Sequence, residues 1–426
     1  MRRLFALWIA LVSSVLPSVW ASAGSTIGPY NLDDCFSLAL KRSDTLAIDV
    51  SQINQAEAQI NEARANYFPT ISGNGSFSMQ QTPNTGLGQT IFPSNQSSAA
   101  ITLKQNLFNG LKDLASIHSK KSQKVYYEAA HAQAVVQLFE DTAQAFYSVL
   151  AYRSDLKNYL AEIESDQRRR RELLDSRKFG RSRDADVVSV ESSIANLEAS
   201  ASNVDGLLAT YEETLAYLTG LPVDVELASA LQKTPEAHDL SYWLDKIEER
   251  PDVKRAKSDI DVADGNLQAT KAGYLPSLDF AANYYPYRPG IYQGIAWDTT
   301  LSLSIPLFSG GSTRAQVSEQ SSVETAKEIA FHQTKEQASQ SVRTVYRALA
   351  ADTKQMEKLA SASALAQKSY ELRHKDNRLG IATNTDVLSA LTSAQESKRS
   401  SDRQKFIVLS DYSKLLAESA RLNIGK

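Results

Sequence analysis

Two aspartates, Asp186 and Asp386, are the residues of this chain whose type and spacing best suit chemistry. Each precedes a valine and follows a glycine by six positions, Gly180 or Gly380, and the two lie 200 positions apart. Carboxylates that are held close together attract cations, raise one another's pKa values and titrate collectively. A structural role is the other interpretation, because an acid in the first turn of a helix interacts favourably with the helix dipole. The sequence alone leaves both open.

Signatures of catalysis are not found. There is no His-Glu-x-x-His motif, no pair of cysteines, no glycine-rich phosphate loop and no Gly-x-Ser-x-Gly elbow. The segment 308–312 comes nearest to such an elbow, and we interpret it as a junction between a strand and a helix. The five histidines are scattered: His118, His131, His238, His332 and His374. We predict no enzyme activity, no cofactor and no metal site.

Short motifs recur at a nearly constant offset and indicate a tandem duplication of one unit. Beyond the two aspartates, the tip triad Phe179-Gly180-Arg181 returns as Leu379-Gly380-Ile381. The junction Leu107-Phe108-Asn109-Gly110 returns as Leu307-Phe308-Ser309-Gly310, and Tyr67-Phe68-Pro69 returns as Tyr274-Leu275-Pro276.

Each unit contains one very long helix. No proline or glycine lies between Gly110 and Phe179, and apolar residues recur there at a spacing of three to four, which predicts a helix of about 70 residues, or about 105 Å. A matching helix is expected from Gly311 to Leu379. Shorter helices are expected at about 43–67, 184–219, 252–274 and 384–421. Stacked end to end, two short helices are about 90 Å long, so we expect a wall of alternating continuous and broken rods.

Strands are expected between each proline motif and the following Leu-Phe pair. From Trp297 to Ile305 apolar and polar residues alternate, as they do within 71–80, 101–106 and 278–284. About ten residues is the length of a tilted strand that crosses a bilayer, and aromatic residues cluster at both ends of the segments. A soluble sandwich is the alternative. We predict a mainly α protein with membrane β, containing four membrane strands per chain.

The bulk properties fit an exported protein. Residues 1–23 carry Arg2-Arg3, an apolar run and Ala21-Ser22-Ala23, which predicts a cleavable signal peptide, with a twin-arginine signal as the alternative. The net charge of −3 does not indicate nucleic acid as a partner. The lone Cys35 is expected to be buried in a helix. No later apolar run is long enough for a membrane-spanning helix.

We divide the mature chain into two repeats. The first, 24–219, has a strand hairpin at about 70–107 and a helical tip near 180, and the second, 251–426, has a strand hairpin at about 277–307 and a tip near 380. Residues 220–250 form a linker that is expected to pack as a belt around the helices.

Four strands cannot close a barrel, because an open edge in lipid leaves backbone groups unpaired. Two chains would give eight strands around a filled interior, and three chains would give twelve around an aqueous lumen. Since the polar strand faces carry Ser, Asn, Gln and Thr, we favour the homotrimer.

These features together resemble the TolC-like outer-membrane efflux proteins over essentially the whole mature chain. The resemblance implies a trimeric, 12-stranded barrel in the outer membrane of a Gram-negative cell, continued by an α-helical barrel through the periplasm. It also implies a periplasmic adaptor protein that docks on the helical tips, and an inner-membrane pump or ABC secretion transporter. A barrel-anchored surface stalk or adhesin is the alternative function.

The resemblance also assigns roles to residues at the tips. It places Asp386 at the pore constriction and Asp186 at its partner position in the first repeat. It assigns adaptor docking to Phe179, Gly180, Arg181, Leu379, Gly380 and Ile381, for which a plain helix C-cap is the alternative. Ser389 and Ala382 depart from the family pattern, which puts a second acidic ring and an arginine latch in doubt.

The first tip is rich in basic residues. They could meet an acidic adaptor surface or anionic cargo, or they could form an ordinary solvated helix face. The residues are Arg168 to Arg171, Arg177, Lys178, Arg181 and Arg183. The junction residues assigned to the strand–helix boundaries are Pro69, Leu107, Phe108, Gly110, Pro276, Leu307, Phe308 and Gly310.

Overall fold

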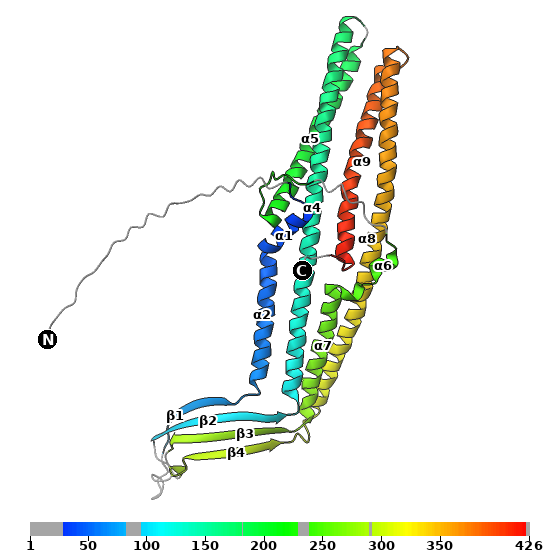
Figure 1. Cartoon of the computed structure of the whole chain (residues 1–426). Coiled ribbons are helices and arrows are strands. Elements are labelled where there is room, and N and C mark those ends of the chain that lie inside the picture. The colour runs from blue at the N-terminus through cyan, green and yellow to red at the C-terminus, as the bar shows by residue number, and fades with distance from the viewer. Residues whose placement is uncertain (1–28, 82–94, 181, 229–237, 289–291, 423–426) are drawn as a thin grey trace, which may run out of the picture.

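Long helices stand on one end of a four-stranded sheet (Figure 1). The computed structural model describes residues 29–81, 95–180, 182–228, 238–288 and 292–422. Two helical hairpins run away from the sheet, and their tips lie at the same end of the molecule (Figure 1). The expected signal peptide and Arg181 lie outside the described residues.

The same order of elements occurs twice along the chain. The first half contains α1 (Leu32–Arg42), α2 (Asp44–Ala65), β1 (Thr70–Met79), β2 (Asn95–Asn109), α4 (Lys112–Lys178) and α5 (Asp184–Thr219). The second contains α6 (Leu240–Leu244), η1 (Ile247–Glu249), α7 (Pro251–Lys271), η2 (Ala272–Tyr274), β3 (Ser277–Tyr287), β4 (Trp297–Ser304), α8 (Ser312–Arg378) and α9 (Asn384–Glu418).

The predicted helices are confirmed with small shifts at their ends. Both long helices have 67 residues, or about 100 Å at 1.5 Å per residue. The return helix α5 begins and ends where it was expected, whereas α9 ends at Glu418 rather than near Arg421. The strand β2 has 15 residues, because its pairing with β1 begins at Asn95, well before the alternating segment 101–106. None of the described helices combines the length and the apolar character needed to cross a bilayer.

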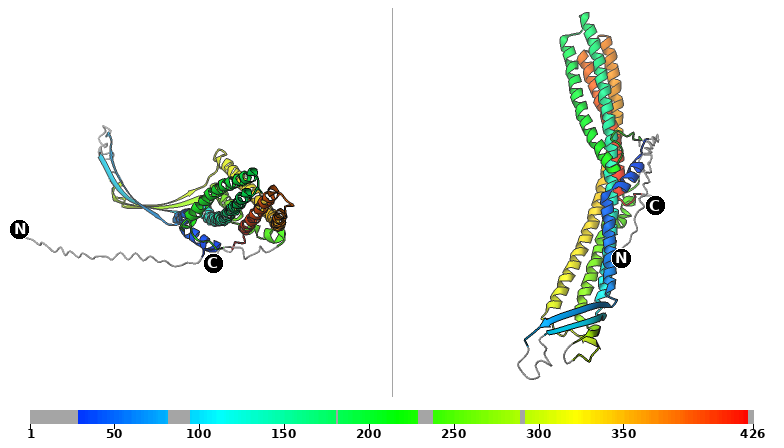
Figure 2. Two further views of the ribbon diagram at one scale, coloured as in Figure 1. Left: turned by 90° about the horizontal axis from the view of Figure 1, so that it is seen from above. Right: turned by 90° about the vertical axis from the view of Figure 1, so that its left-hand side faces the viewer.

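The sheet is antiparallel in the order β1-β2-β3-β4, and it curves away from the helices (Figure 2). Its register places Ser72, Thr102, Asn283 and Asp298 in one row and Ile71, Leu103, Ala282 and Thr299 in the next. In the polar row Thr102 Oγ1 donates to Asn283 Oδ1 at 2.8 Å, and Asn283 Nδ2 donates to Asp298 Oδ1 at 2.8 Å. Neighbouring rows point to opposite faces, so one face of the sheet is polar and the other largely apolar.

Helix α4 is at the centre of the helical layer. It packs against α1, α2, α5, α7 and α9, and its Phe146 is fully buried in a cluster with Leu215 of α5 and Leu409 of α9. The predicted burial of Cys35 is confirmed in the same cluster. In the linker, α6 buries Trp243 against Val342 of α8. These contacts hold the two hairpins together midway along their length.

The break between α9 and α7 is closed by a buried arginine. Arg250 donates from Nε and Nη2 to the two carboxylate oxygens of Asp252 in α7, at 3.0 and 2.7 Å. Its Nη1 donates to Glu418 Oε2 at 2.5 Å and to the Glu418 backbone carbonyl at the end of α9. One guanidinium therefore joins the two helices into a single rod.

The break between α5 and α1 is built differently. Arg42 lies against Gly220, where an added Cβ would come within 2.7 Å of its guanidinium. A cavity of about 530 Å³ opens beside it, lined among others by Leu46 and Tyr217. Within the described residues Arg42 forms no ion pair, so this break lacks the clamp found in the second half.

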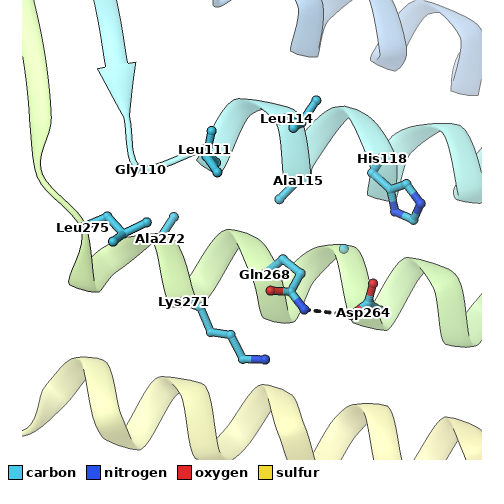
Figure 3. Close-up of a pocket in the computed structure, with 11 residues that line it drawn as sticks. Gly110, Leu111, Leu114, Ala115, His118, Asp264, Gln268, Lys271, Ala272 and Leu275 are labelled. Atoms are coloured by element: carbon cyan, nitrogen blue, oxygen red, sulfur yellow. Dashed lines mark hydrogen bonds between the residues drawn. The ribbon is translucent and has the colours of Figure 1, made fainter.

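The strand–helix junctions of the two halves also differ, and Figure 3 shows the one at Gly110. Gly110 has φ +69°, and a Cβ there would lie 2.7 Å from both Ala272 O and Leu275 Cβ, so the close approach requires glycine. A mostly apolar cavity of about 570 Å³ lies beside it between α4 and α7. Gly310 has φ +65° but open space around it, and the neighbouring Leu307 and Phe308 are about nine-tenths exposed.

Candidate functional site

The first helical tip turns through Gly180. Helix α4 ends at Lys178, Gly180 adopts φ +70°, and its N–H donates to Arg177 O at 2.9 Å. Phe179 is 77 % exposed at the apex. The expected glycine C-cap is present.

Asp186 is buried just below this tip. Its carboxylate accepts hydrogen bonds from the Arg183 backbone N–H at 3.1 Å, from Asn384 Nδ2 at 3.3 Å and from Arg183 Nη2 at 3.4 Å. The side chain is only 7 % exposed. Burial raises the pKa of Asp186, but these hydrogen bonds outweigh the burial and hold the pKa below its ordinary value. The carboxylate is ionised, and both of its oxygens accept hydrogen bonds from neighbouring groups.

The second tip has the same turn and a more polar lining. Gly380 adopts φ +75°, its N–H donates to Asn377 O at 3.0 Å, and Asn377 Nδ2 donates to Ala382 O at 2.8 Å. Leu379 and Ile381 on either side of the glycine are exposed. Ala382, where an arginine latch was in doubt, contributes its backbone carbonyl to the turn.

Asp386 is exposed and closes a capping box with Thr383. The Thr383 N–H and Oγ1–H donate to Asp386 Oδ2 at 2.9 and 2.7 Å, and the Asp386 N–H donates to Thr383 Oγ1 at 3.2 Å. The hydrogen bonds from the Thr383 side chain and backbone lower the pKa of Asp386. Among the residues that the structure describes, no hydrogen bond to the other carboxylate oxygen, Oδ1, is found.

A hydrogen-bonded chain links the two tips. Arg169 of α4 donates from Nη2 to Asn384 Oδ1 at 2.6 Å and to Asn377 Oδ1 at 3.5 Å. Asn384 in turn donates to Asp186, so three helices meet at one amide. A polar cavity of about 440 Å³ lies beside the chain, lined among others by His374 and Arg378. Sequence reasoning missed Arg169 in this role, because the residue stands in a basic run whose four members look alike.

The basic residues of the first tip are largely paired with acids. Arg177 Nη1 lies 3.0 Å from Asp184 Oδ1, and Lys178 Nζ lies 2.8 Å from Asp175 Oδ1. Arg183 pairs with Asp186, and Arg168 and Arg170 pair with Glu164 and Glu191. This pairing favours the solvated-face interpretation over a free cationic ring. Across the described residues no group of three or more His, Cys, Asp or Glu side chains is arranged to hold a metal ion.

Comparison with solved structures identifies the class of fold. The chain has a TM-score of 0.82 with a crystal structure of CusC at 16 % identity, covering 91 % of both chains. It has a TM-score of 0.80 with the outer membrane protein VceC of Vibrio cholerae at 17 % identity, covering 91 % of this chain and 95 % of that one. The fold is that of the TolC-like outer-membrane channels.

The sequence comparisons give the family. The family model described as "Outer membrane efflux protein" matches residues 35–221 and 245–401. The chain is also similar to the toluene efflux pump outer membrane protein TtgC of Pseudomonas putida, with 22 % identity over 383 residues, covering 86 % of this chain and 78 % of that protein. This chain belongs to the outer membrane efflux protein family. It is an outer-membrane transport protein of Gram-negative bacteria and not an enzyme.

Proposed function

We propose that three copies of this chain form a gated exit duct that carries substrates from an inner-membrane pump, through the periplasm, to the exterior. The main support is the sheet, which has two unpaired edges among the described residues, one polar face and one largely apolar face. Within the described residues β1 pairs only with β2, and β4 pairs only with β3. Free edges are untenable in lipid, so the sheet must continue into neighbouring chains, and three chains would give a 12-stranded barrel.

The polar row of the sheet supports an aqueous lumen. Thr102, Asn283 and Asp298 are hydrogen-bonded across three strands on the polar face, and the adjacent row places Ile71 and Leu103 on the apolar face. An eight-stranded barrel would have to fill its interior with such side chains, whereas a wider barrel leaves room for water. The repeated order of elements also supports our division into repeats 24–219 and 251–426 joined by 220–250, with 1–23 as a signal peptide.

The tips are proposed as the gate and the docking surface. Asp386 is exposed, with a free carboxylate oxygen, and we place it at the narrowest point of the duct. Phe179, Leu379 and Ile381 are exposed apolar side chains that a periplasmic adaptor helix could cover. The adaptor would open the tips if it binds the open state more tightly than the closed one.

The first test combines the mass of the detergent-purified protein with single-channel conductance in a planar bilayer. A trimer with a small, cation-preferring conductance is expected. Asp386→Ala should reduce the cation preference and the block by multivalent cations, because it removes the carboxylate at the constriction. Asp205→Ala, at an exposed acid of α5 far from the tips, is the control and should change neither. A monomer in membrane-like detergent would contradict the proposal.

The docking surface can be tested separately. Phe179→Ser and Ile381→Ser should weaken capture of the cognate adaptor while leaving the trimer mass unchanged, since both side chains are exposed and contribute little to the fold. Undiminished adaptor binding by the double variant would refute this part of the proposal. TtgC is named for toluene efflux, and the family match does not favour the alternative of a barrel-anchored stalk.

A further inference from the structure

The cavity between α4 and α7 at the first strand–helix junction changes from apolar to polar along its length. Leu111, Ala272 and Leu275 lie at its end beside the strands, and His118 and Asp264 lie farther along the helices (Figure 3). Its volume of about 570 Å³ is within the range of small-molecule sites. A molecule that fits it is apolar toward the sheet and polar away from the sheet.

Leu111 has a backbone conformation that is unfavourable for a leucine. Its φ is +70°, in the left-handed region that glycine adopts freely and other residues rarely adopt. Gly311, at the corresponding position before α8, has φ +86°. The Leu111 side chain is 58 % exposed, so packing within the chain does not explain a leucine at this position. A contact with a molecule outside the chain would explain it.

The two junctions differ on the side of the helices. An exposed Leu-Phe pair occurs at both, at 107–108 and at 307–308. In contrast, Leu114 and His118 of α4 correspond to Arg314 and Ser318 of α8, 200 positions later. The apolar lining on the first long helix is therefore not a general requirement for joining a strand to a helix in this fold.

The position of the cavity argues against a second copy of the chain as its occupant. Gly110 follows β2 and Leu275 precedes β3, and these are the two inner strands of the sheet. Further chains would join at the outer strands, β1 and β4, instead. On the far side of the cavity α4 and α7 pack closely, since a Cβ added at Gly265 would lie 2.8 Å from Ser119 Cβ.

The cavity opens on the side of the molecule that carries α1. Leu114 and Phe139 are separated by about seven helical turns and therefore lie on one face of α4. The Phe139 ring packs against Phe36 of α1, with 5.1 Å between the ring centroids, and α1 (blue) lies on the convex side of the curved sheet (Figure 2). In a barrel the convex side faces the lipid, so the cavity lies where the helices leave the membrane.

The polar end of the cavity carries one charge of each sign. Lys271 and Asp264 belong to α7 and lie about two turns apart on the face that lines the cavity. Asp264 Oδ1 accepts a hydrogen bond from Gln268 Nε2 at 3.0 Å, whereas Lys271 makes no hydrogen bond to the other lining residues (Figure 3). A phosphate for the lysine and an ammonium group for the aspartate would match this pair.

We propose that the cavity binds a zwitterionic phospholipid of the inner leaflet of the outer membrane. An acyl chain lies against Leu111, Leu114 and Leu275, the phosphate meets Lys271, and the ammonium group meets Asp264. The bound lipid sets the level at which the chain passes from membrane to periplasm. This inference rests on the duct proposed above for its orientation, because the barrel places the convex side of the sheet in lipid.

Photolabelling in vesicles tests the site. The protein is reconstituted in vesicles of phosphatidylethanolamine and phosphatidylglycerol with a trace of phosphatidylethanolamine that carries a diazirine on its acyl chain, near the glycerol. We expect several-fold more label on residues 107–118 and 268–275 than on 307–318, which occupies the corresponding place at the second junction. Equal labelling of the two junctions would overturn the proposal, because it would reveal only the lipid that surrounds any membrane protein.

Variants that copy the second half provide a matched check. Leu111→Gly combined with Leu114→Arg gives the first junction the residues of the second, and it relieves the backbone strain rather than adding any. Labelling of 107–118 should then fall to the level of 307–318. Val125→Ser alters an exposed apolar residue of α4 outside the cavity and should leave the labelling unchanged. Undiminished labelling of the double variant would refute the site.

Native mass spectrometry tests the headgroup. Lys271→Gln should lower the fraction of protein that retains phosphatidylethanolamine by roughly two- to fivefold, as expected for one exposed charge pair. Asp264→Asn should reduce the preference for phosphatidylethanolamine over phosphatidylglycerol. Lys254→Gln, at an exposed lysine of α7 outside the cavity, should change neither. Equal retention of the two lipids by the unmodified chain would overturn the headgroup assignment.

The mass of the complex keeps this proposal separate from that of the duct. A trimer whose two junctions label equally leaves the duct standing and removes the lipid site. A monomer that still labels mainly at the first junction removes the duct and keeps the lipid site.

Discussion

The two tips share a sequence motif but not the use of its aspartate. Asp186 is buried and accepts three hydrogen bonds, one of them from Asn384 of the other tip. Asp386 is exposed, and its carboxylate is bonded only to Thr383 among the described residues. The difference arises because Asn384 of the second hairpin packs against Asp186 just below the first tip, whereas Asp386 is exposed in the single chain.

The comparison distinguishes a buried, hydrogen-bonded carboxylate, Asp186, from an exposed one, Asp386. Both side chains occupy the third position of their helix and satisfy its first turn, so the capping interpretation holds for both. Of the two, only Asp386 is exposed and has a carboxylate oxygen for which no hydrogen bond is found among the described residues, and the proposed cation site depends on that oxygen. Equal positions in two repeats therefore do not imply equal roles.

The largest expected difference comes from removing each aspartate. Asp186→Ala leaves Asn384 Nδ2 and the Arg183 N–H without a buried acceptor, which costs about 1–3 kcal/mol. Amides of the first turn of α5 should then exchange hydrogen roughly tenfold to a hundredfold faster. Asp184→Ala, at an exposed neighbour on the same turn, is the control with little effect. Equal losses from Asp186→Ala and Asp386→Ala would break the comparison.

Removing the link between the tips should have the next largest effect. Arg169→Met keeps the length of the side chain but leaves Asn384 Oδ1 without its donor, so the contact between the hairpins should weaken by about 1–2 kcal/mol. Hydrogen exchange over residues 374–384 would measure the loss. Arg170→Met removes a surface pair with Glu191 and should change little. An equal response from the two arginine variants would argue against the bridge.

A smaller difference is expected between the residues that precede the return helices. Thr383 caps α9 with its hydroxyl group, so Thr383→Ala should destabilise that helix start by about 1 kcal/mol. Arg183 provides no side-chain cap to α5, and Arg183→Ala should cost less. Exchange rates of the first-turn amides of both helices test the order, and a larger loss from Arg183→Ala would reverse it.

The smallest effect near neutral pH is expected from titration of the tips. The pKa values of Asp186 and Asp386 both lie below the ordinary 3.8, so their stabilisation is present above that value and is lost as the pH falls through the folded-state pKa. A spin label at Thr385→Cys should keep constant mobility from pH 8 to 5 and gain mobility only below about pH 4. Mobility that rises between pH 5 and 8 would contradict this assignment.

The helical part of the fold was readable from local signals. Uninterrupted apolar spacing and the glycines at 180 and 380 fix the long helices, because a residue with positive φ ends them. The strand β2 was underestimated, because its first residues, such as Ser97 and Ser98, carry no alternation and are placed by pairing with β1. Cross-strand pairing is a tertiary interaction that a single segment does not encode.

The positions of the two tips could be predicted from the sequence, but the contacts that their side chains make could not. The motif gives both aspartates, yet Asp186 is distinguished by Asn384, which lies 198 positions away. Three buried acids of α4 carried a usable signal, since Asp155, Glu162 and Asp166 interrupt its apolar stripe at helical spacing. Arg399 pairs with Glu162 and Arg403 with Asp155, and these partners are set by the packing of α9, which no local pattern reveals.

The Arg250 clamp gives the second half a mechanical property that the first half lacks. A guanidinium that holds the end of α9 and the start of α7 at once transmits torque across the break, so a twist applied at the second tip is delivered to α7 and on to β3. At the first break α1 and α5 meet through apolar packing, because Cys35 of α1 lies in one buried cluster with Leu208 and Leu215 of α5. A pull on α9 is therefore passed to α7 through the hydrogen bonds of one charged group, whereas a pull on α5 is passed to α1 through apolar contacts.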